Sequence, residues 1–122
     1  MASLLPHILN SPKKPGSIVL EIIQDESGNV IARASDDEML LKLFLEEEIG
    51  QTSRNGYEVI KGIRAAVESN LPYEFVGNAY SLDLSGDSIE ISFLFDETVP
   101  ILKIPISTFL QVLVYWLSLL KP

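Results

Sequence analysis

The side chains of this sequence that could take part in chemistry are almost all carboxylates. Its 122 residues include 17 Asp and Glu residues, one histidine and no cysteine. Disulfides, thiolate metal sites and thiol nucleophiles are therefore excluded. The histidine, His7, has no second histidine and no His–Glu spacing to complete a metal or catalytic set. The glycines form no phosphate-binding motif. We expect no catalytic residue, no metal and no cofactor.

The two densest carboxylate runs also have structural explanations. Three consecutive helical residues spread over about 200° around the axis, so Glu46, Glu47 and Glu48 should not converge on one substrate atom. They are typical of a solvated helix face. Asp36, Asp37 and Glu38 precede an apolar run, at a helix N-terminus where the helix dipole favours negative charge. The sequence thus favours binding over catalysis, and we do not expect an enzyme.

The charge balance restricts the class of partner. The net charge is −8 and the isoelectric point is about 4.5. A surface of this sign repels phosphate backbones, which argues against direct nucleic-acid binding. It would speed the encounter with a basic protein and help to select it. Solubility alone would also account for a charge of this size.

One predicted hairpin places like charges opposite each other. Apolar and polar residues alternate through 80–85 and again through 88–95, with Gly86-Asp87 as the turn. This register sets Leu84 opposite Ile89 and Asp83 opposite Glu90, and like charges directly opposite destabilise a sheet. Residues 83–97 contain no Lys or Arg. We expect an acidic surface for a cationic partner. Two alternatives remain: the carboxylates extend into water, or Lys103 on the neighbouring strand neutralises them.

The carboxylates of this hairpin, of its neighbouring connections and of the triple-Glu run are the candidate partner-binding residues: Asp83, Asp87, Glu90, Asp96, Glu97, Glu46, Glu47 and Glu48.

The surrounding pattern predicts a single α+β domain over residues 17–122, after an irregular lead-in at 1–16. Strands are expected at 17–24, 30–35, 80–85, 88–95 and 101–106, with Pro105 at an edge or at a strand end. A capping box of Ser35 and Glu38 should open a helix that ends near Gly50. A second helix is expected at 57–69 and a third after an N-cap at Ser107. The order β-β-α-α-β-β-β-α predicts an antiparallel sheet of about five strands with the helices on one face.

Two predicted helices carry apolar residues that need cover. In the second, Tyr57, Ile60, Ile63 and Val67 recur at helical spacing and should face the core. Val59 and Ala66 widen this apolar stripe. The last, Phe109–Leu120, is apolar almost all round, so it is covered either within the core or by a second subunit in a homodimer. At about twelve residues it is shorter than the ~20 that span a membrane. The N-terminus does not resemble a signal peptide, so we expect a cytoplasmic protein with no membrane association.

The C-terminal half resembles a known class of small proteins. The run YEFVGNAYSLDLSGDSIEIS, a following strand and a helix that opens TFLQVL are similar to immunity proteins of contact-dependent growth inhibition systems and to related small acidic enterobacterial proteins. The resemblance covers about residues 73–120. It implies a cytoplasmic protein that binds and neutralises a cationic toxin domain, often a nuclease. Tyr57, Tyr73 and Phe75 are candidate anchors for such a partner, with a place in the core as the alternative for each. The alternative is a small acidic secretion-type chaperone that acts as a dimer.

Overall fold

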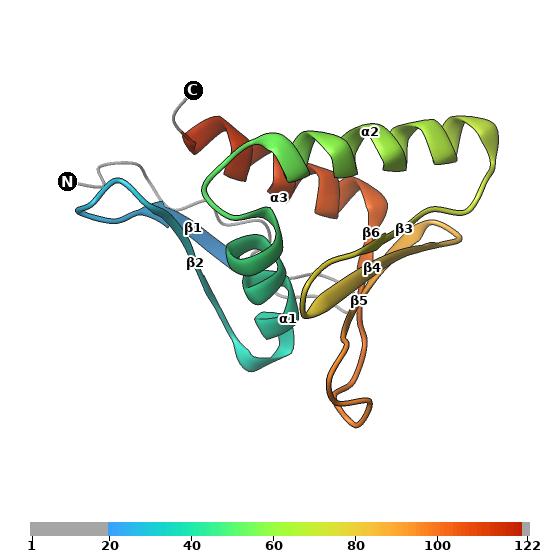
Figure 1. The fold of residues 1–122 in the computed structure, drawn as a ribbon, viewed down its shortest axis with the longest axis horizontal. Coiled ribbons are helices and arrows are strands. Elements are labelled where there is room, and N and C mark those ends of the chain that lie inside the picture. Colours follow the sequence, from blue (N-terminus) through green and yellow to red (C-terminus); the bar gives the residue numbers. More distant parts are fainter. Residues whose placement is uncertain (1–19, 121–122) are drawn as a thin grey trace.

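A computed structural model describes residues 20–120, and it has an α+β fold. β1 (Leu20–Gln24) and β2 (Val30–Ala34) form an antiparallel pair. The strands β3 (Glu74–Val76), β4 (Tyr80–Ser85), β5 (Ser88–Phe93) and β6 (Leu102–Pro105) form a second antiparallel sheet in that order (Figure 1). The described part therefore contains six strands in two sheets, where the sequence predicted about five in one. The predicted lead-in at 1–16 lies outside the described residues.

The register of the β4–β5 hairpin is the one predicted from the alternating pattern. Leu84 pairs with Ile89 and Asp83 with Glu90, and Gly86 takes the positive φ of 62° that the two-residue turn requires. β6 is an edge strand and Pro105 is its last residue, so both predicted places for this proline are realised. β5 ends at Phe93 rather than at residue 95, so the predicted strand was too long at its C-terminal end.

Before the second helix, the chain passes through three short helical segments. They are the 3₁₀ turn η1 (Asp36–Glu38), α1 (Met39–Leu43) and the π-helical η2 (Phe44–Ile49), which ends at Gly50 as predicted, with φ 72°. The predicted capping box is wrong in detail. Ser35 and Glu38 hydrogen-bond to each other through their side chains, and the side chain of Ser35 makes no capping hydrogen bond to the helix.

The remaining helices, α2 (Arg54–Ser69) and α3 (Ile106–Leu119), lie side by side (Figure 1). α3 packs between α2 and the four-stranded sheet. It begins at Ile106 after Pro105, so Ser107 is not its N-cap. Its buried residues include Phe109, Leu113 and Trp116. Most apolar side chains of this helix are thus buried within the chain, while Val114 remains 45% exposed.

The buried face of α2 contains four of the six residues predicted for it, and the other two, Tyr57 and Val67, are exposed. The helix begins three residues earlier than expected, and Gly56, Val59, Ile60, Ile63 and Ala66 face the core. Tyr57 and Val67 are 55% and 51% exposed. Glycine at position 56 permits the helices to approach closely, because a Cβ there would lie 2.5 Å from Cδ2 of Leu117.

Candidate functional site

The outer face of the four-stranded sheet carries a row of carboxylates, one on each of three adjacent strands. Glu74 on β3 pairs with Asp83 on β4, and Asp83 pairs with Glu90 on β5. We call these three residues the acidic row. Lys103 on β6 is the next partner, opposite Glu90. The core residues Leu82, Ile89 and Ile91 lie on the other, helix-covered face, because successive side chains of a strand point to opposite sides.

The backbone hydrogen-bond pattern brings the side chains of Glu74 and Asp83 close together. The backbone N–H of Leu84 donates to the carbonyl of Tyr73 at 3.0 Å, which makes Glu74–Asp83 a non-hydrogen-bonded pair. Side chains are closest in such pairs, and like charges there destabilise by about 0.2–1 kcal/mol. The sequence predicted only the Asp83–Glu90 repulsion. The structure adds a second one, which has no signal in the sequence pattern because β3 has only three residues.

Among the described residues, no lysine or arginine forms an ion pair with this row. Lys103 forms none with Glu90 or with any other residue of 20–120, so the predicted alternative of neutralisation by Lys103 is not realised as a direct contact. No basic residue occurs between Arg64 and Lys103 in the sequence. Asp87, in the hairpin turn, is exposed and adds to the negative charge at this end of the sheet.

The β5–β6 connection at 94–101 presents acidic and apolar side chains together, and Figure 1 shows it extending beyond the rest of the sheet. Phe95 is 73% exposed and Ile101 is 57% exposed. Asp96 accepts hydrogen bonds from the hydroxyl of Thr98 at 2.6 Å and from its backbone N–H at 3.0 Å. These bonds, the hydroxyl bond first, lower the pKa of Asp96 below its usual value. Asp96 therefore remains charged well below neutral pH, and the exposed Glu97 follows it in the same connection.

Of the three consecutive glutamates at 46–48, only Glu47 is exposed to solvent, as predicted for the whole run. Glu46 is partly buried, forms a 2.7 Å ion pair with Lys42 and accepts the backbone N–H of Ala32 at 2.9 Å. Glu48 is only 5% exposed. Both carboxylates are engaged within the fold. Glu48 is buried, whereas the side chain of Glu46 remains 23% exposed.

Glu48 holds the loop between β3 and β4, residues 77–79. Its carboxylate accepts backbone N–H groups from Asn78 at 2.9 Å, Ala79 at 2.8 Å and Tyr80 at 2.9 Å. A Cβ at Gly77 would lie 2.1 Å from Oε1 of Glu48, so the carboxylate occupies the space that a larger residue would need. This contact fixes the β3–β4 hairpin, and with it the position of Glu74 in the acidic row, against η2.

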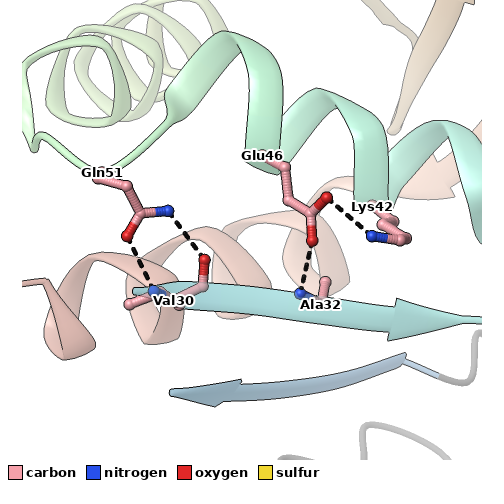
Figure 2. A network of polar contacts seen from close by, with 5 residues as sticks. All are labelled: Val30, Ala32, Lys42, Glu46 and Gln51. Carbon is pink, nitrogen blue, oxygen red and sulfur yellow. Dashed lines mark hydrogen bonds and ion pairs between the residues drawn. The ribbon is translucent and has the colours of Figure 1, made fainter. Parts of the chain in front are cut away.

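Two side chains cover the edge of β2 that faces away from β1 (Figure 2). The amide of Gln51 accepts the N–H of Val30 and donates to the carbonyl of Val30, both at 2.8 Å, as a neighbouring strand would. Glu46 accepts the next outward N–H, that of Ala32. An open edge is a template for pairing with another chain, and these contacts close it.

The three aromatic residues considered as anchors have different environments. Tyr57 is exposed on α2, away from the acidic row. Phe75 packs edge-on against Phe44 with ring centroids 5.8 Å apart. Tyr73 packs against α2, where a Cβ at Gly62 would lie 2.1 Å from its Cε1. Phe75 and Tyr73 therefore belong mainly to the core.

Burial also acts on two tyrosine hydroxyls. Desolvation, followed by the charge of Glu58, raises the pKa of Tyr73. Desolvation, followed by the charges of Glu47 and Glu48, raises the pKa of Tyr80. The folded protein therefore favours the neutral form of both phenols.

Metal-binding and membrane-spanning features do not occur in the described part of the chain. Within residues 20–120, no group of three or more His, Asp or Glu side chains is placed to hold a metal ion. None of the helices in this range is long and apolar enough to cross a membrane. No protein-family model matches the sequence, and neither a curated protein nor a solved structure matches it. The resemblance to immunity proteins stays a prediction.

Proposed function

We propose that this chain is a protein-binding module that binds a cationic protein domain through the outer face of its four-stranded sheet and the adjoining β5–β6 connection. We further propose that the partner is the toxic domain, a nuclease, of a contact-dependent growth inhibition toxin, and that binding neutralises it. The observation that supports the proposal most is the acidic row, Glu74, Asp83 and Glu90, which is set side by side on neighbouring strands without an ion pair to any described cation.

The acidic row has a cost that a partner would remove. Adjacent like charges destabilise the sheet, and serine or threonine at these positions would avoid the repulsion. A cationic partner would relieve it and would be steered toward the face by the same field. Exposed apolar groups border the face, among them Phe95 and Val76, which is 59% exposed. Apolar and aromatic groups of this kind supply the central contacts of many protein interfaces.

The toxin-specific part of the proposal depends on the sequence resemblance together with charge. A nuclease domain carries a basic cleft that binds the phosphate backbone of its nucleic-acid substrate. A rigid acidic sheet is complementary in charge to such a cleft. A dimeric chaperone receives less support, because α3 buries most of its apolar side chains within the chain, Phe109 and Trp116 among them, and exposes chiefly Val114.

The experiment measures the affinity of this chain for the protein encoded by the adjacent gene, which the proposal expects to contain a basic toxin domain. The Asp83→Ser/Glu90→Ser double variant should bind at least about tenfold more weakly, mainly through a slower on-rate that depends less on salt. Its melting temperature should stay the same or rise, because both repulsive pairs of the acidic row, Glu74–Asp83 and Asp83–Glu90, are removed.

A matched control separates local from global charge. Glu58→Ser/Glu68→Ser changes the net charge by the same amount on the exposed side of α2, and it should leave the affinity nearly unchanged. Equal losses of affinity in both double variants would mean that binding depends on net charge alone and not on the sheet face. Unchanged affinity in the Asp83/Glu90 variant would refute the sheet face as the binding surface.

A further inference from the structure

An apolar groove of about 460 Å³ separates the first helical segments from the β5–β6 connection. One wall comes from α1 and the other from the end of β5, the connection and the start of β6. The apolar side chains that define it are Met39, Leu40, Leu43, Phe93, Val99 and Ile101. Asp36 and Asp37, of η1, also line it.

The floor of the groove packs against the core, and the open side of the groove faces solvent. Leu40, Leu43 and Phe93 are partly buried and pack against the main core, so their positions are set by the fold. Phe93 stacks at a tilt against Tyr80, with ring centroids 5.3 Å apart. Ile101 is 57% exposed at the rim. A preformed concave apolar surface that is open to water is characteristic of binding sites.

The polar lining of the groove is negatively charged. Asp36 and Asp37 are exposed, and neither forms an ion pair with a described residue. The nearest lysine in the sequence is Lys42, whose Nζ forms an ion pair with Oε1 of Glu46 at 2.7 Å. An apolar side chain that enters the groove would therefore be favoured if lysine or arginine flanked it, since these charges could reach the two carboxylates.

We propose that this groove binds an apolar side chain, of the size of leucine, methionine or phenylalanine, that is flanked by basic residues on the cationic partner. This inference rests on the proposed function and adds to it the chemistry of a second contact. The β5–β6 connection forms a wall of the groove and also borders the acidic sheet face, so one partner contacts both surfaces. A second copy of this chain is disfavoured as the occupant, because its net charge of −8 would meet the carboxylates of the groove.

The direct test uses three synthetic peptides that differ only at their centre, which reads Lys-Leu-Lys, Lys-Gly-Lys or Asp-Leu-Asp. Each is titrated into the ¹⁵N-labelled protein and followed by NMR. The Lys-Leu-Lys peptide should shift the amide signals of Leu40, Val99 and Ile101. The other two peptides should bind about ten- to a hundredfold more weakly. Lys-Gly-Lys lacks the apolar side chain that the groove buries, and Asp-Leu-Asp brings negative charge close to Asp36 and Asp37.

Two variants test the lining separately. Ile101→Ser should weaken binding of the Lys-Leu-Lys peptide, and so should Asp36→Asn/Asp37→Asn. Ile101 is exposed, so Ile101→Ser should keep the wild-type melting temperature. Asp36→Asn/Asp37→Asn should lower it only slightly, because both positions are exposed but their charges favour the helix N-terminus. Leu71→Ser, at a residue that is 59% exposed on a different surface, is the matched apolar control and should bind like wild type.

The outcomes distinguish this inference from the proposed function. If Lys-Gly-Lys binds as well as Lys-Leu-Lys, or if shifts occur only on the sheet face, the groove proposal is wrong. It is also wrong if light scattering detects a dimer that Ile101→Ser abolishes, because the occupant is then a second copy. If the groove variants leave toxin-domain affinity unchanged while Asp83→Ser/Glu90→Ser lowers it, the proposed function stands without the groove. If the peptide binds the groove but no cationic protein domain binds the chain, the proposed function fails instead.

Discussion

The contact between Glu48 and the β3–β4 loop leads to the most specific stability prediction. We expect Glu48→Gln to destabilise the protein, although it changes a single oxygen to a nitrogen. The wild-type carboxylate accepts three backbone N–H groups, from Asn78, Ala79 and Tyr80. A glutamine amide has one oxygen, so at least one of these N–H groups would face an NH₂ donor and lose its acceptor.

The size of the effect follows from these bonds. Hydrogen bonds to a charged group contribute about 1.5–3 kcal/mol each, and a buried donor left without a partner costs about 1–3 kcal/mol. The smaller desolvation of the neutral amide offsets part of this loss. We expect a net loss of about 2–4 kcal/mol in the free energy of unfolding. At about 4 °C per kcal/mol, this corresponds to a melting temperature lower by roughly 8–16 °C.

The assay is denaturant unfolding followed by the fluorescence of Trp116, the single tryptophan, which is fully buried. Glu47→Gln, at the exposed neighbour, is the control and should stay within about 0.5 kcal/mol of wild type. Gly77→Ala should also destabilise, because its Cβ displaces the carboxylate of Glu48. The Glu48→Gln/Gly77→Ala double variant should lose less stability than the sum of the two single losses, because both changes disrupt the same contact. Equal stability of Glu48→Gln and Glu47→Gln would refute the assigned role of Glu48.

Three further predictions concern other contacts. Gln51→Ala should uncover the N–H and carbonyl of Val30 at the β2 edge, lower stability by about 1–2 kcal/mol and increase self-association, measured by denaturation and light scattering; an unchanged monomer of wild-type stability would contradict the edge role. Gly62→Ala should lower the melting temperature despite the better helix propensity of alanine, because its Cβ meets the ring of Tyr73; a stabilised variant would mean that the ring moves freely. The raised pKa values of Tyr73 and Tyr80 mean that the stability they contribute is fully present below pH ~10 and is lost as pH rises through the folded-state values. Tyr80→Phe should reduce that alkaline loss in a pH series of unfolding free energies, and an identical pH profile would argue against it.

The sequence by itself determined the parts of the fold that depend on local pattern. The alternation through residues 80–93 and the Gly86-Asp87 turn specified both strands and their register, because a slip by one residue would expose Leu82 and Ile89. The same register places Asp83 opposite Glu90, so this repulsive pair is a property of the local pattern alone. Glycine at position 50 likewise set the end of η2, since it readily takes a positive φ.

Only the tertiary structure decided what lies across from these elements. β3 is too short to be recognised by its pattern, and its pairing with β4 is what completes the acidic row with Glu74. Helical spacing predicted that Glu48 faces solvent, but the docking of η2 on the β3–β4 loop buries it against backbone N–H groups some thirty residues away in the chain. Periodicity records which side of an element is apolar. It does not record which partner meets that side, because the partner is chosen by the packing of the whole chain.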